Sequence, residues 1–457
     1  MTASAGAETR KFGRSAGLLS SGIALSGVLT YVFFALSSHN LSAHEYGEIT
    51  VLWSAVFVTI SIAHRPVELL LSRTIAERRA RGEETGSAMR VAGLIQLVVS
   101  AGLAALALLL RGPLQDELLG GSETLYWVLV VAVVAFGASF YARGFLAGNR
   151  RFGLLAALLF CESASRMAFA LAVAVGIASG QATIALGVAA APLFSLAVVP
   201  FALSLRARSG PAAPAASQGA PGAGASGLTV ASGGGFAAGV LVVMMGEQTF
   251  LNAGPLLARA FEDAAAAGFI FNVLMVARAP LLVFQGVAQS LLPHLTRLGA
   301  RGKDAAAAFH HSVAVTIRAI AVFAALVALV VLVVGPALMQ IAFGDRFEYD
   351  RLGLVIVALG MGGYLTATTL NQAILARGGA RVAARCWGLT AAAFLAWCLL
   401  PVVGDIDLRI ELGFALGAAL LAAQLAVAYR GRAPGPPLQP DSPDEIEARL
   451  AGYDEVS

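Results

Sequence analysis

Seven charged side chains fall inside long apolar runs of this sequence, where a charge needs a partner or water. They are four arginines and three glutamates: Arg65, Glu68, Glu162, Arg166, Glu247, Arg278 and Arg318. A guanidinium group stays ionised and can bind phosphate oxygens through two parallel hydrogen bonds. A carboxylate inside a membrane can exchange a proton or a sodium ion for a cationic substrate. The set predicts a charged cargo, and the excess of arginine favours an anion.

Two pairs within the set have a structural alternative. Arg65 and Glu68 are three residues apart, and Glu162 and Arg166 are four apart, so each pair can share one face of a helix. Arg65 and Glu68 also lie near the inner end of their run, from which long side chains can reach lipid headgroups. For both pairs, a structural ion pair and a role in cargo binding stay open.

Glu247 and Arg278 have no such partner on their own runs and are stronger candidates for lining a cavity. Their mutual pairing between helices is the structural alternative. Gln248 and Asn252 follow Glu247 and lie one helical turn apart. Arg318, about two turns from the inner end of its run, can instead extend to the membrane surface. The candidate residues of a substrate cavity are Arg65, Glu68, Glu162, Arg166, Glu247, Gln248, Asn252, Arg278 and Arg318.

Apolar runs of spanning length position these residues. Hydrophobic residues make up 58% of the 457 residues and charged residues only 13%, too few for the surface of a soluble protein. Runs of about 20 apolar residues fit membrane helices and are too long for barrel strands. We therefore predict an all-α membrane protein with about twelve transmembrane helices. The runs are 16–37, 47–71, 91–110, 125–146, 154–178, 183–204, 233–258, 267–293, 311–334, 352–375, 382–403 and 411–429.

Basic residues in the loops predict the orientation of this bundle. With the N-terminus inside, 22 of the 31 lysines and arginines, Arg143 among them, fall on the inner side and 5 fall on the outer side. Cytoplasmic loops carry such an excess, so both termini are predicted in the cytoplasm of a bacterial-type inner membrane. Because the basic residues in these loops are explained by the orientation of the bundle in the membrane, they give no reason to expect a nucleic-acid partner.

The outer loops are short, which leaves no room for an ordered catalytic pocket outside the membrane. The sequence also has no Walker loop and no zinc-ligand spacing. We expect no enzymatic activity, no cofactor and no metal site.

A segment rich in Gly, Ala, Ser and Pro divides the twelve runs into six and six. Such composition predicts a flexible linker. The predicted organisation is an N-terminal lobe at 1–208, a cytoplasmic linker at 209–234, a C-terminal lobe at 235–432 and a disordered acidic tail at 433–457.

The two halves carry a weak internal repeat. Tyr46-Gly47 corresponds to Ala267-Gly268, and the segment 145–151 corresponds to 374–381, at offsets of 221 and 229 residues. Six helices per half in matching orientation imply a parallel repeat about an axis along the membrane normal. A two-lobed bundle of this kind places a central cavity between its six-helix lobes.

At these residues the sequence resembles polysaccharide flippases of the multidrug/oligosaccharidyl-lipid/polysaccharide (MOP) exporter superfamily, over essentially the whole chain. The similar segments are Leu-Ser-Ala-His-Glu-Tyr-Gly at 41–47, the basic turn at 148–151 and the segment 278–293. The resemblance implies alternating access that moves a lipid-linked oligosaccharide or polysaccharide precursor to the outer leaflet. The partners would be a polyprenyl diphosphate-linked glycan, membrane lipids and a coupling ion.

Two other functions stay open at this stage. An ion-coupled multidrug or cation antiporter of the same superfamily would use Glu247 as the exchanging carboxylate. A non-transporting membrane component of a glycan-assembly complex would need none of the intramembrane charges.

Overall fold

The computed structural model describes residues 2–200, 230–275, 278, 305–375, 377 and 379–431. Within these ranges all regular secondary structure is helical, and eleven helices are long and apolar enough to cross a membrane. The predicted all-α membrane bundle is confirmed. Most of the predicted eighth run lies outside the described residues, and its first part belongs to the shorter apolar helix Ala264–Met275. The predicted tail and most of the predicted linker also lie outside the described residues.

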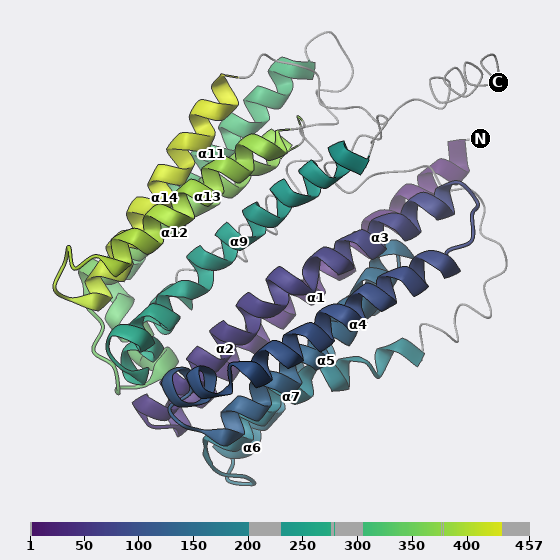
Figure 1. Cartoon of the computed structure of the whole chain (residues 1–457). Coiled ribbons are helices and arrows are strands. Elements are labelled where there is room, and N and C mark those ends of the chain that lie inside the picture. Colours follow the sequence, from purple (N-terminus) through teal and green to yellow (C-terminus); the bar gives the residue numbers. More distant parts are fainter. Residues whose placement is uncertain are drawn as a thin grey trace.

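Figure 1 shows two groups of helices, which we call the N-terminal and C-terminal lobes. The N-terminal lobe consists of α1 (Thr2–Asn40), α2 (Ala43–Ala63), α3 (Arg65–Ala80), α4 (Gly86–Leu109), η1 (Pro113–Leu118), α5 (Glu123–Gly148), α6 (Phe152–Ala174) and α7 (Gly180–Ser195). The C-terminal lobe consists of α9 (Val230–Phe261), the helix Ala264–Met275, α11 (Ala305–Phe343), α12 (Arg351–Leu375), α13 (Ala380–Leu399) and α14 (Ile406–Arg430).

Helices α2 and α3 form one long candidate span, Ala43–Ala80, that is interrupted at His64. Ser42 caps its start, because the Ser42 hydroxyl accepts from the Glu45 N–H and the Glu45 carboxylate accepts from the Ser42 N–H. Pro66 follows the break, at a position where a helix start needs no N–H donor. The predicted run 47–71 was too short at its inner end. Arg65 therefore begins the 16-residue helix α3 instead of lying near the end of a span.

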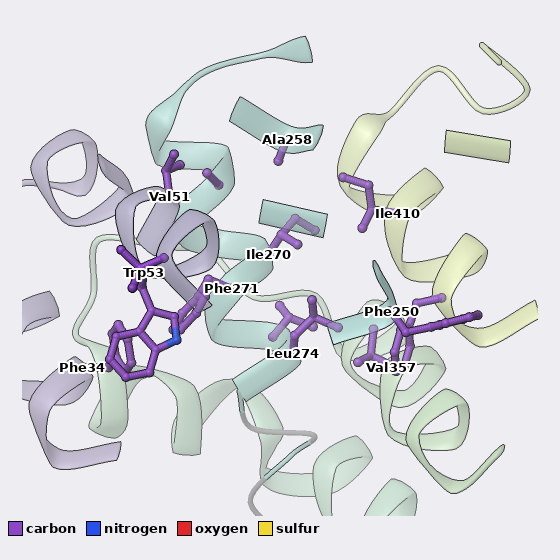
Figure 2. Close-up of a cluster of buried hydrophobic side chains, with 14 of the residues drawn as sticks. Phe34, Val51, Trp53, Phe250, Ala258, Ile270, Phe271, Leu274, Val357 and Ile410 are labelled. Carbon is purple, nitrogen blue, oxygen red and sulfur yellow. The ribbon is translucent and has the colours of Figure 1, made fainter. Parts of the chain in front are cut away.

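The two lobes meet at one end of the bundle, which we call the outer end after the predicted orientation; that orientation itself stays a prediction. The Ser38 hydroxyl donates to the Phe343 carbonyl, and Arg259 Nε donates to the Leu118 carbonyl at 3.1 Å. Figure 2 shows part of a buried apolar cluster with side chains from both lobes, in which the ring centroids of Phe34 and Phe271 lie 4.5 Å apart. Every hydrogen bond that joins described residues of the two lobes lies in this outer half.

Two glycines allow the lobes to touch backbone to backbone at the outer end. A Cβ atom on Gly47 would lie 1.6 Å from the Ala264 carbonyl oxygen, and a Cβ atom on Gly268 would lie 3.2 Å from the Gly47 Cα. These are the two glycines that the internal repeat relates. Beside them the Tyr46 hydroxyl donates to the Asn272 side-chain oxygen, and the Asn272 amide donates to the Tyr349 hydroxyl at 2.9 Å. The chain is therefore in a conformation closed at the outer end.

Candidate functional site: charges along the lobe interface

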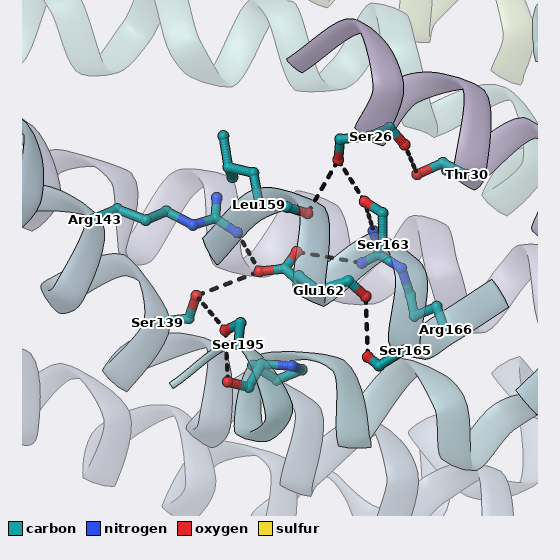
Figure 3. Close-up of polar contacts among 11 residues, drawn as sticks. Ser26, Thr30, Ser139, Arg143, Leu159, Glu162, Ser163, Ser165, Arg166 and Ser195 are labelled. Carbon is teal, nitrogen blue, oxygen red and sulfur yellow. Dashed lines mark hydrogen bonds and ion pairs between the residues drawn. The ribbon is translucent and has the colours of Figure 1, made fainter. Parts of the chain in front are cut away.

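The N-terminal lobe holds a buried ion triad around Glu162 on α6. Its Oε2 atom accepts from Arg143 Nη2 at 2.5 Å, and its Oε1 atom accepts from Arg166 Nη1 at 3.3 Å (Figure 3). The side chains of Glu162, Arg166 and Arg143 are 5%, 4% and 13% exposed. The intrahelical pair that the sequence suggested is present, as one half of a larger cluster.

Arg143 had been assigned to an inner loop, and that assignment is wrong. It lies on α5 within the helix Glu123–Gly148 and reaches across to α6. Arg143 lies near the end of the predicted run 125–146, where hydropathy cannot distinguish a loop from the last buried turns of a helix. The buried partner Glu162, 19 residues further along, was the available signal.

Hydroxyl groups and aromatic rings complete the surroundings of the triad. Ser139 donates to Glu162 Oε2 at 3.3 Å, and Arg166 Nη2 donates to the Ser163 hydroxyl at 3.2 Å. The Arg166 guanidinium lies over the Trp53 ring at 4.8 Å, where the ring face attracts a cation. These contacts join α5, α6 and α2, and a cargo-binding role for Glu162 and Arg166 stays a prediction.

Glu68 and Arg65 connect this triad to the lobe interface. The Glu68 carboxylate interacts electrostatically first with Arg143 and then with Arg65. Arg65 is exposed, and it makes no ion pair with Glu68 within 4 Å in the part of the chain that the structure describes. The suggested Arg65–Glu68 pair is therefore not formed.

On the opposite lobe, Glu247 on α9 is half-buried and interacts electrostatically with Arg65 across the interface. Tyr364 on α12 is buried and interacts with Glu247, Arg278 and Arg65. We call Arg65, Glu247, Arg278 and Tyr364 the interlobe cluster. Tyr364 was missed by sequence reasoning, because a tyrosine in an apolar run is as typical of a packed core as of a site.

Arg278 has free hydrogen-bonding capacity in this cluster. Its Nε and Nη2 atoms are buried and have no hydrogen-bond partner among the described residues. The proposed pairing of Arg278 with Glu247 is not among the ion pairs of the described chain, and the charge acting on Glu247 is that of Arg65. Two arginines and one glutamate give the cluster a net charge of +1 when all three are ionised.

The remaining candidates lie apart from the cluster. Gln248 and Asn252 are buried on α9, and the Asn252 amide donates to the Gln248 oxygen at 2.8 Å, so the two satisfy each other. Arg318 lies exposed on α11 with no ion pair to another described residue. Neither observation assigns these three residues to a cavity, and their role there stays a prediction.

Removing Glu162 should destabilise the protein strongly, because Arg143 and Arg166 would face each other in a buried site. We expect Glu162→Ala to lower the free energy of unfolding by about 3–5 kcal/mol, measured by thermal unfolding of the purified protein in detergent. Glu123→Ala is the matched control. Its partner Arg111 lies 3.0 Å away, but both side chains are about half exposed or more, so the loss should be at most about 1 kcal/mol. Equal melting temperatures for the two variants would contradict the structural role of the triad.

The chain resembles known proteins in its fold and not in its sequence. No family model matches the chain, and no curated protein sequence matches it significantly. Among solved structures, an inward-facing multidrug resistance MATE family transporter of the MOP superfamily superposes with a TM-score of 0.68. It is 9% identical, and the match covers 94% of this chain and 96% of that one. The fold is that of MATE transporters.

Two further MATE structures agree with this assignment of the fold. A eukaryotic MATE transporter is 12% identical, with 98% of each chain covered and a TM-score of 0.60. A mutant form of the Vibrio cholerae MATE transporter VcmN is 16% identical, with 92% of this chain and 97% of that chain covered and a TM-score of 0.58. Identities this low establish the MATE fold alone. The predicted two-lobed helical fold is thus confirmed, and membership of the MOP superfamily and of its polysaccharide branch stays a prediction.

An outward-facing multidrug resistance MATE family transporter of the MOP superfamily also shares the fold, with 12% identity and a TM-score of 0.59.

Proposed function

We propose that the protein is an alternating-access membrane transporter whose substrate binds at the interlobe cluster. The MATE fold supports the transport mechanism, because two lobes joined at one end can rock about a site between them. The cluster supports the location, because its charges come from both lobes. A substrate held there would interact differently with the two lobe arrangements, which alternating access requires.

The cargo that the charges favour is an anion, and we propose a lipid-linked oligosaccharide or polysaccharide precursor carried on a polyprenyl diphosphate. Arg278 carries this proposal, since its buried Nε and Nη2 atoms are donors without an acceptor among the described residues. A phosphate oxygen pair matches the guanidinium fork. A diphosphate also needs such a path, because it cannot cross hydrocarbon unaided.

An ion-coupled multidrug or cation antiporter is the second candidate function, and the comparisons favour it over the first. The inward-facing and outward-facing structures that share the fold are described as multidrug resistance transporters. Glu247 would then be the carboxylate that exchanges a proton or sodium ion for a cationic substrate. The net positive charge of the interlobe cluster is the observation that favours the anionic cargo instead.

Transport by the purified protein in liposomes separates these candidates. We expect a fluorescent polyprenyl diphosphate sugar to move between leaflets, measured as protection from a membrane-impermeant quencher. The same lipid without its phosphates should stay in place, because it offers Arg278 no acceptor. Uptake of a cationic dye driven by a proton or sodium gradient, without movement of the diphosphate lipid, would replace the first candidate by the second. Movement of neither probe would contradict transport.

A further inference from the structure

The outer end of the C-terminal lobe contains an acidic cavity that the proposed transport function does not use. It has a volume of about 600 Å³ and is lined by the loops that precede the helix Ala264–Met275, α12 and α14. Seven carboxylates and a single arginine, Arg346, line it. A volume in the range of small-molecule sites and a strong excess of one charge together indicate a ligand of the opposite charge.

Three of the seven carboxylates have a structural explanation. Asp263, Asp350 and Asp405 each accept hydrogen bonds from backbone N–H groups within the next three residues, at 2.9 to 3.2 Å. They cap the starts of the helices that follow, which is a common role for aspartate at a helix N-terminus. Caps alone do not require a ligand.

Glu411 has no such explanation. It lies on α14 and lines the cavity, its residue is only 5% exposed, and it makes no hydrogen bond or ion pair with another described residue. Its carboxylate occupies space that the missing side chain of Gly353 leaves open, since a Cβ atom there would lie 2.3 Å from Oε2. One turn earlier, the Oδ1 atom of Asp407 is buried and has no hydrogen-bond partner among the described residues. An ionised carboxylate without a partner is costly to bury, so these two side chains are stable either when protonated or when paired with a cation.

The nearby arginines do not supply that cation. Arg346 Nη2 donates to the His39 carbonyl at 3.3 Å, and Arg409 Nε donates to the Val403 carbonyl at 2.8 Å. Neither forms an ion pair with a carboxylate in the described ranges. At the rim, partial burial and then the charges of Asp263 and Asp405 raise the pKa of Glu262 above its ordinary value. The cavity thus carries acidic charge that the described protein side chains leave uncompensated.

The arrangement of the carboxylates favours an organic cation over a metal ion. Among the described residues, no three His, Cys, Asp or Glu side chains are placed to hold a metal ion. The acidic groups instead surround a cavity whose other lining includes Phe269, Phe347 and Leu408. An organic amine with several ammonium groups separated by methylene segments would pair these groups with different carboxylates. Its methylene carbons would pack on the apolar side chains.

We propose that this cavity binds an organic polyamine, with the buried Glu411 and the half-buried Asp407 as its anchors. The site depends on the observations at the outer end and not on the identity of the transported cargo.

Spermidine is the probe for this site, and calorimetric titration of the purified full-length protein in nanodiscs is the measurement. We expect saturable binding that weakens about tenfold or more in Glu411→Gln, because the neutral amide can still accept a hydrogen bond but lacks the negative charge that strengthens it. Asp407→Asn should also weaken it and serves as a second variant if Glu411→Gln folds poorly. Glu117→Gln, an exposed acidic residue of the same outer end outside the cavity, should bind as the wild type does.

Glu247→Gln separates this site from the interlobe cluster. We expect it to retain spermidine binding, whichever cargo is transported. If Glu247→Gln loses spermidine binding while Glu411→Gln keeps it, the amine binds at the interlobe cluster and the proposal is overturned. Equal spermidine binding by all four variants would also overturn the proposal. So would complete loss of binding in magnesium at equal ionic strength, because either result would show only nonspecific attraction to an acidic surface.

Discussion

Gly47→Leu should hold the protein open at its outer end and abolish transport of either candidate cargo. Any Cβ atom at this position would lie 1.6 Å from the Ala264 carbonyl oxygen and 2.3 Å from its carbon. Backbone atoms of a packed helix cannot move aside as a flexible side chain can, and interiors leave no free volume for the shift. The closed conformation should therefore be lost, while the lobes themselves keep their packing.

Two measurements check this expectation. Spin labels at the exposed positions Asn40 and Asp345 report the distance between the lobes at the outer end, after the three native cysteines are replaced. The distance distribution should shift to longer values in Gly47→Leu. Gly102→Leu is the matched control, because a Cβ atom at Gly102 of α4 has no neighbour within 4 Å. A wild-type distance distribution and wild-type transport in Gly47→Leu would show that closure does not depend on this contact.

The position of Gly47 shows what the sequence could and could not predict at the interface. The internal repeat related Gly47 to Gly268, and the structure places these two glycines against each other. A repeat predicts which residues correspond in the two halves, but not which of them lie near the symmetry axis. Contact at the axis depends on how the lobes are tilted, which hydropathy does not encode.

The helices themselves could be predicted well, because a spanning segment requires an apolar run of a length that physics fixes. Boundaries were less predictable where a helix continues beyond the membrane core. The span of α2 and α3 extends to Ala80, nine residues beyond its predicted end at 71. The early end at 71 put Arg65 near the end of a helix, and Arg143 was counted with the loop residues although the predicted run 125–146 includes it.

The site was predictable in its residue types but not in its partners. Glu162 and Arg166 could be paired from their spacing, because helix geometry determines which residues share a face. Partners between helices, such as Arg143 with Glu162 or Arg65 with Glu247, depend on packing that no local pattern specifies. The unpaired Glu411 could not be singled out for the same reason, since it begins an apolar run beside several ordinary loop carboxylates.

Arg278→Ala should abolish transport of a diphosphate lipid while the protein still inserts and folds. The substitution removes the buried Nε and Nη2 donors, which have no partner among the described residues and so stabilise nothing else there. Hydrogen bonds to a charged group contribute about 1.5–3 kcal/mol each, so losing the fork should slow transport by about two orders of magnitude or more. Arg278→Lys should restore only part of the rate, because an ammonium keeps the charge but lacks the planar fork. Glu247→Gln should have a milder effect on this cargo.

The order of these variants determines the sign of the cargo. In a cation antiporter Glu247 must release its proton or sodium ion to bind the substrate, so Glu247→Gln should be inactive and Arg278→Ala should keep most of its activity. Export of glycan to the cell surface and resistance to cationic drugs are measured for each variant at matched abundance in the membrane. Arg318→Ala is the control for loss of an intramembrane arginine, because Arg318 is exposed on α11 and lies outside the interlobe cluster. Normal glycan export by Arg278→Ala together with loss of drug resistance in Glu247→Gln would rule out the anionic cargo and establish the antiporter.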